Sequence, residues 1–178
     1  MKGVTVKFDS KKWQEALFKQ LSLEQTTRLI AYAKEQTQSI GDDISVAPTT
    51  NNLDRTGNLL DSLCWGVYHN GGQKGSGYYR KESATEDAYL HEFSNPKGML
   101  VNGHALAQNF IATYTPTTTN GWEVFFAMLA PYWGYWEKGF TMPRTGLKFQ
   151  WQVMTHHWDE VKRDLHPSRV TFNNYIPS

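Results

Sequence analysis

The sequence closes on its strongest helical pattern, which constrains the folds that the chain can adopt. Apolar residues recur there in steps of four and three, on a single stripe: Leu147, Trp151, Met154, Trp158, Val161 and Leu165. Since an α-helix has about 3.6 residues per turn, this spacing predicts an amphipathic helix that packs on a partner surface. Pro167 ends the pattern. Residues 168–178 are expected to form a tail that a partner orders.

A second helical pattern begins at Ser10, which can act as an N-cap. Its apolar positions also recur at spacings of three and four: Trp13, Ala16, Leu17 and Leu21. Ser22 and Gln25 have the spacing of a capping box, which predicts that the helix restarts there. We therefore expect a kinked helical pair from Ser10 to Ile40, ended by Gly41.

The region that follows combines short strands with turns. Residues 42–52 are expected to form an exposed linker, and Thr56 can cap a short helical turn. Residues 64–69 read as a strand because apolar side chains alternate along them. Residues 110–115 and 122–129 are also predicted strands, joined as a hairpin at Asn120-Gly121.

The predicted strand at residues 122–129 is apolar on both faces. Trp122, Val124 and Phe126 face one way, and Phe125 and Ala127 face the other. A helix covers only one face of an antiparallel strand. We therefore expect the second face to be covered either by another subunit or by the central part of the chain.

That central part, residues 71–107, lacks a clear period and is interpreted as an insertion. It begins in a glycine-rich stretch, residues 70–77, that is predicted to be a mobile loop. With 178 residues the chain is expected to form a single domain, 1–178. The predicted class is α+β: a small antiparallel sheet packed against a long N-terminal helix and a C-terminal helix, with a central insertion.

Composition excludes several functional classes. The 18 Lys and Arg residues nearly balance 17 Asp and Glu residues, so no strong field draws the chain to free DNA or anionic lipid. No apolar run is long enough to span a bilayer, and the N-terminus lacks the apolar run of a secretory signal. A single cysteine excludes a disulfide within the chain. We expect a protein made in a reducing cytoplasm.

Two short motifs carry a family resemblance. The first contains Asp54, Thr56, Gly57, Asn58 and Leu59; the second contains Tyr132, Tyr135, Glu137 and Gly139. Their order between two helical patterns resembles the tail-completion or head-tail joining family of tailed bacteriophages. The chain departs from the family pattern in three places: Arg55 interrupts the first motif, Lys138 replaces the usual aromatic residue, and a proline is displaced to Pro48.

The resemblance implies a non-enzymatic virion protein of the neck, made in the cytoplasm of a bacterial host, with no cofactor and no metal. Its partners would be copies of itself in a ring, the portal or adaptor, and tail proteins, while DNA passes through the channel without sequence-specific binding. A ring needs two different adhesive faces on each subunit. We expect surplus apolar groups to supply them, with Trp133, Trp136 and Phe149 as interface candidates.

Two alternatives remain open at this point: a small hydrolase that uses Cys64, and a capsid-decorating protein. Cys64 with a downstream His91 or His104 has the order of a thiol amidohydrolase, but a strand position does not activate a thiol, so a buried structural thiol is favoured. His156 and His157 diverge on a helix and cannot share one metal ion. We expect these two histidines to lie at the surface and at the edge of the apolar stripe of the C-terminal helix.

Overall fold

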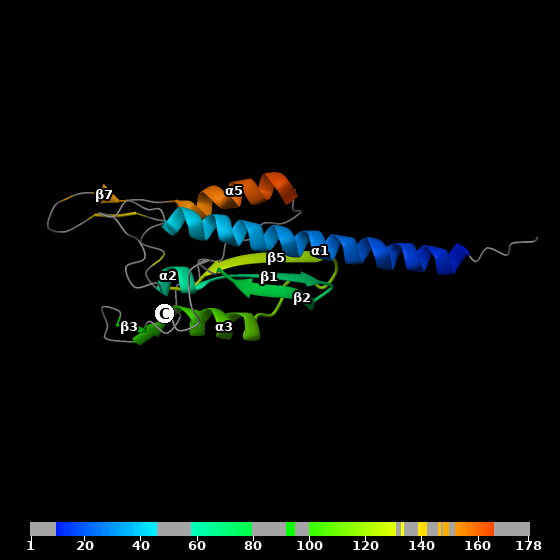
Figure 1. Ribbon diagram of the computed structural model, residues 1–178, viewed down its shortest axis with the longest axis horizontal. Coiled ribbons are helices and arrows are strands. Elements are labelled where there is room, and N and C mark those ends of the chain that lie inside the picture. Colours follow the sequence, from blue (N-terminus) through cyan, green and yellow to red (C-terminus); the bar gives the residue numbers. More distant parts are fainter. Residues whose placement is uncertain are drawn as a thin grey trace, which may run out of the picture.

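The computed structural model describes residues 10–45, 58–79, 92–94, 100–130, 133, 139–141, 146, 148–149 and 152–165. Helix α5 (Val153–Leu165) lies on helix α1 (Ser10–Ser45), α1 lies on a three-stranded sheet, and helix α3 (Gly103–Thr113) covers the opposite face of the sheet (Figure 1). The expected α+β class is confirmed: a small antiparallel sheet, a long N-terminal helix and a C-terminal helix are present, and the C-terminal helix packs on the N-terminal one.

The sheet has the order β2-β1-β5 and is antiparallel throughout. Its strands are β1 (Leu63–His69), β2 (Gly72–Tyr78) and β5 (Trp122–Met128). The predicted strands at residues 64–69 and 122–129 are thus confirmed. The shorter elements are helix α2 (Asn58–Asp61) and two small strand pairs, β3 (Glu92–Ser94) with β4 (Leu100–Asn102) and β6 (Phe140–Thr141) with β7 (Lys148–Phe149). None of the described helices has the length and apolar character needed to cross a membrane.

Alternation along β1 divides the core between the two faces of the sheet. Trp65 and Val67 pack with Ala33 of α1, whereas Cys64 and Tyr68 pack with Ala107 of α3. The same alternation continues on β5, because Trp65 pairs with Phe126 in the antiparallel register. Both faces of the central strand are therefore buried within the chain.

Helix α3 covers the second apolar face of β5. Phe125 and Ala127 pack in one cluster with Leu106, Ala107 and other residues of α3 and its C-terminal end: Phe110, Ile111 and Tyr114. Of the two coverings that we considered, another subunit or the central part of the chain, neither describes α3 fully: the covering comes from the same chain, but only residues 103–107 of α3 belong to the predicted insertion. The predicted strand at residues 110–115 and its hairpin are wrong, since residues 110–113 belong to α3 and β5 pairs with β1. The helix begins where the Asn102 side chain accepts a hydrogen bond from the Ala105 amide.

The Glu123 carboxylate fixes the connection between α3 and β5. It accepts hydrogen bonds from the Tyr114 and Thr117 hydroxyls and from the Thr118 amide. Burial alone would raise the pKa of Glu123, but these donors favour the charged form and hold its pKa below the ordinary value. We call these three hydrogen bonds the Glu123 clasp. They hold the C-terminal end of α3 against the sheet.

The glycine-rich stretch that we predicted as a mobile loop is strand β2. The prediction is wrong because glycine here permits close packing. A β-carbon at Gly75 would crowd Ile30 of α1, and one at Gly77 would crowd the Trp65 indole. Gly72–Tyr78 therefore forms an edge strand. Its glycines have no side chain, so α1 and the Trp65 indole can pack closely against its backbone. The hairpin turn contains Asn70 and Gly71, both with positive φ.

Helix α1 is one continuous helix, so the predicted kinked pair is wrong. It does not restart near Ser22, whose carbonyl accepts a hydrogen bond from the Thr26 hydroxyl within the helix. It also does not end at Gly41. Gly41 is buried and lies under the Tyr79 ring, where any β-carbon would overlap the ring. The start of the predicted linker, Asp42–Ser45, is accordingly the last part of α1.

The C-terminal helix is shorter than its apolar pattern predicted. It begins at Val153, and Lys148 and Phe149 form strand β7 instead of a first helical turn. Residues 147 and 151, which opened the predicted stripe, and the tail 168–178 lie outside the described residues. Met154, Val161 and Leu165 keep the spacing that identified the helix.

Replacing Gly41 by alanine tests the contact with Tyr79. Alanine would normally stabilise a helix by about 1 kcal/mol relative to glycine. Here the added methyl forces the Tyr79 ring to move, so we expect Gly41→Ala to lower the free energy of unfolding by about 1–3 kcal/mol. Urea denaturation in wild-type and Tyr79→Ala backgrounds measures the coupling. In the Tyr79→Ala background the same change should be neutral or stabilising, and an equal loss in both backgrounds would contradict this account.

Candidate functional site at the motif junction

The structure describes part of each motif segment. Asn58 and Leu59 open helix α2, and Gly139 has a positive φ that suits glycine. Phe149 lies in β7, and Trp133 lies between β5 and β6. The remaining predicted site residues fall outside the described residues: Asp54, Thr56, Gly57, Tyr132, Tyr135, Trp136 and Glu137.

The two segments, more than seventy residues apart in sequence, meet at one cluster of buried side chains. Leu59 is buried in this cluster, and the half-buried Trp133 packs against it. Ile40 and Ile44 of α1 and Met128 of β5 complete its centre. We call this region the motif junction. Sequence reasoning placed the segments in order but did not predict that they share a cluster.

The Ser62 hydroxyl binds the two segments together. It donates to the Leu59 carbonyl at 2.8 Å and accepts from the amides of Leu129 and Ala130 at 3.2 and 2.9 Å. Ser62 is fully buried, so no water replaces these partners when the hydroxyl is removed. One side chain therefore joins the end of α2 to the chain that leaves β5 for the second motif.

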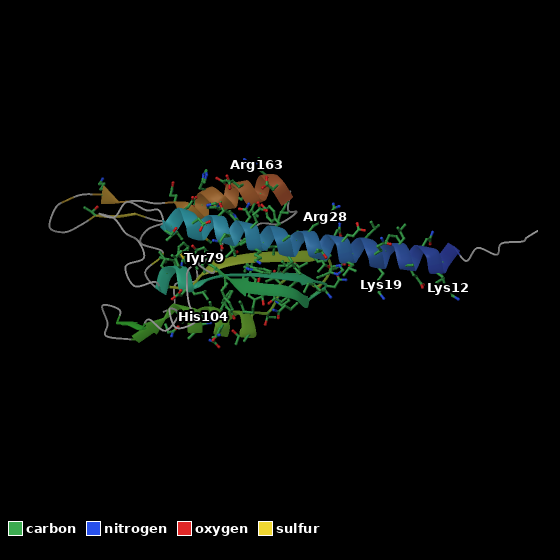
Figure 2. All side chains as sticks on the ribbon, viewed as in Figure 1. Lys12, Lys19, Arg28, Tyr79, His104 and Arg163 are labelled. Atoms are coloured by element: carbon green, nitrogen blue, oxygen red, sulfur yellow. The ribbon has the colours of Figure 1, made fainter. Side chains whose placement is uncertain are left out.

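The last turns of α1 are joined to the junction from two further sides. The Tyr79 hydroxyl donates to Asp42 at 3.2 Å, and the Tyr79 amide donates to the Leu63 carbonyl at 2.9 Å. On the other side of α1, His157 of α5 lies 2.9 Å from an Asp43 carboxylate oxygen. Figure 2 shows Tyr79 between α1 and α2. The junction thus collects α1, α2, β2 and α5 at one end of the sheet.

The two adjacent histidines of α5 differ in environment. His156 is exposed, as expected, whereas His157 is buried between the helices and paired with Asp43 and Glu160. The prediction that His157 lies at the edge of the stripe missed this pairing, because Asp43 is 114 residues away. Among the described residues no group of three His, Cys, Asp or Glu side chains is placed to hold a metal ion.

Cys64 lies in the core beneath α3. It has no exposed surface, and burial raises the pKa of its thiol to about 12. The thiol is therefore protonated at neutral pH, whereas nucleophilic cysteines depend on a stabilised thiolate. Burial likewise lowers the pKa of His104, one of the two histidines that we considered as its partner; His91 lies outside the described residues.

The N-terminal half of α1 is the main feature that sequence reasoning misjudged. Leu17 and Leu21 were assigned to a packed apolar stripe, but this half extends past the end of the sheet and of α5 (Figure 1). The large exposed apolar side chains of the described chain gather here: Leu17 at 38%, Phe18 at 69%, Leu21 at 47% and Leu23 at 67% of full exposure. We call residues 11–28 the projecting half of α1. Residues 11–28 include six charged side chains, and this was the signal against a buried stripe.

Comparisons with protein-family models, with curated proteins and with solved structures gave no match for this chain.

Removing the Ser62 hydroxyl tests its role at the motif junction. Ser62→Ala leaves two buried amides without their acceptor, so we expect the free energy of unfolding to fall by about 1–3 kcal/mol. Ser45→Ala is the matched control, because the Ser45 hydroxyl makes one exposed hydrogen bond, to Asp42. Urea denaturation of both variants gives the comparison. Equal losses would show that Ser62 is not the link between the segments.

Proposed function

We propose that this protein is a structural component of a tailed-bacteriophage virion, in which copies form a ring at the head-tail junction. The ring would connect the portal or adaptor to the tail. The proposal is supported by the two motifs that resemble the tail-completion family, and by Trp133, a neighbour of the second motif, which packs against the cluster that contains Leu59 of the first.

The observation that carries the assembly role is the projecting half of α1. Four large apolar side chains stand exposed on a helix that leaves the body of the protein, and such surfaces commonly mark contacts with other proteins. Most helical stability in proteins comes from tertiary packing, so a partner would stabilise this segment. The half-buried Trp133 packs against the core of its own chain, and its place in an interface stays a prediction.

The chemistry of Cys64 favours assembly over the hydrolase alternative. A buried thiol whose pKa is raised to about 12 supplies no nucleophile at neutral pH. The near balance of charge also suits a channel ring, since DNA that slides through a lumen must not be held there. A capsid-decorating role uses the same kind of exposed surface and is separated from the neck role by location alone.

A density map of the intact virus particle tests the proposed function. We expect density for this chain to encircle the portal axis, with the long α1 as its marker. Density on the faces of the capsid would contradict the neck role and support decoration. A virus that carries Cys64→Ala should assemble normally and keep its wall-cleaving activity. Loss of that activity with normal assembly would favour the hydrolase.

A further inference from the structure

The charges on α1 run against its own helix dipole. The first turn contains Lys11 and Lys12 and no acidic residue, and the last turn contains Asp42 and Asp43 and no basic one. A helix carries partial positive charge at its N-terminus, so each such charge is unfavourable by a few tenths to about 1 kcal/mol. The arrangement therefore does not serve the stability of α1 itself.

The same charges divide α1 into halves of opposite sign. In the projecting half, four basic residues, Lys11, Lys12, Lys19 and Arg28, outnumber Glu15 and Glu24. Figure 2 shows Lys12 and Lys19 on the part of the helix that lies beyond the sheet. In the remaining half, residues 29–45, one lysine faces three carboxylates: Glu35, Asp42 and Asp43.

Helix α5 extends the acidic half into a surface. It lies along residues 32–43 of α1, where the Tyr32 hydroxyl donates to Asp164 at 3.2 Å and His157 pairs with Asp43. The exposed carboxylates on α5 and on residues 29–45 of α1, apart from Asp42 on the Tyr79 side, are Glu35, Asp43, Asp159 and Asp164. With the half-buried Glu160 they outnumber the basic residues of the same segments, Lys34, Lys162 and Arg163, of which Lys162 pairs with Asp159 and Arg163 with Asp164. Half-buried apolar side chains lie on the same helix α5: Trp158 and Leu165. We call this two-helix face the acidic face.

We infer that the projecting half of α1 docks on the acidic face of a second copy of this chain. The lysines and Arg28 would meet the carboxylates, and Leu17, Phe18 and Leu21 would cover the half-buried apolar groups of α5. Because the two surfaces differ, the contact is head-to-tail, which is the type that closes into a ring. The inference deepens the proposed function by naming the surfaces through which copies would meet.

Charge selects this arrangement over pairing of two projecting halves. Two projecting halves would bring together segments that each carry excess positive charge, which is unfavourable. The acidic face carries the opposite excess on the same chain, so a second copy supplies complementary charge with no further component. The apolar groups supply the buried area, and the charges set the direction.

Charge exchange between two variants tests the inference. The first variant carries Lys11→Glu, Lys12→Glu and Lys19→Glu; the second carries Glu35→Lys and Asp159→Lys. The Lys11 and Lys12 changes agree with the helix dipole and Lys19 is exposed, so the first variant should keep the fold of α1. The second variant spares the His157 and Tyr32 contacts and removes the exposed Asp159–Lys162 pair. Lys74→Glu with Lys148→Glu is the control, because both lysines are exposed and lie outside the two surfaces.

Sedimentation of the full chain over a range of concentrations reports association. We expect each variant alone to associate at least about 10-fold more weakly than wild type, the equimolar mixture to recover, and the control to be unchanged. Added salt should weaken the wild-type association. Loss of association in the first variant but not in the second would overturn the inference in favour of paired projecting halves. Wild-type association in both variants would also overturn it.

Zero-length cross-linking of mixed light and heavy isotope copies tests the same contact directly. We expect links between Lys11, Lys12 or Lys19 of one copy and Glu35 or Asp159 of another. A chain that stays monomeric at all concentrations and forms no such links would overturn the inference, even where a particle map shows a ring at the neck. Links of this kind combined with density on the capsid would overturn the neck role and leave the inference standing.

Discussion

The packing of residues 29–45 of α1 across the sheet determines how the rest of the protein is arranged. Ala33 packs on Trp65 and Val67 of β1, while Ile40 and Ile44 pack into the motif junction. These contacts hold the second half of the helix rigidly against the sheet. Because the helix is continuous, they also fix the direction in which its projecting half leaves the body (Figure 1). The packing of residues 29–45 therefore determines where the exposed apolar side chains of the projecting half lie.

The two-sided covering of the sheet limits where a neighbouring protein can bind. Helix α1 covers one face and α3 the other, and the Glu123 clasp holds α3 in place. The contacts between copies that we propose would therefore use surfaces other than the sheet faces. The projecting half of α1 combines exposed apolar side chains with a charge excess that the acidic face can neutralise. A head-to-tail ring needs two different, complementary surfaces on each chain, and the projecting half of α1 and the acidic face are such a pair.

Local patterns predicted the elements whose packing is one-sided or regular. The stripe of α5 and the alternation of β1 and β5 were readable because burial imposes a period on the sequence. Predictions failed where glycine serves a close contact made by a distant residue. Gly41 accommodates Tyr79, and Gly75 and Gly77 accommodate Ile30 and Trp65, so glycine did not mark a helix end or a loop. Such contacts depend on tertiary structure, which a local pattern does not contain.

At the motif junction, too, local elements were predicted from the sequence and tertiary contacts were not. The sequence predicted a short helical turn at Leu59 and a strand after it, and both are present. It did not predict that Ser62 would join this turn to residues 129 and 130, or that Asp43 would pair with His157, since each contact spans more than sixty residues. The apolar stripe at the start of α1 was misread for a related reason. A period of 3.6 shows that a face is apolar, but not whether its partner belongs to the same chain.

Hydrogen exchange along α1 tests most directly the claim that one half of this helix is anchored by its own chain and the other by a neighbour. In dilute solution, the account predicts slow exchange for residues 29–45 and fast exchange for residues 11–28. At concentrations where copies associate, the projecting half should become protected while the anchored half changes little. Equal protection of the two halves in dilute solution, or no gain in protection on association, would contradict the account.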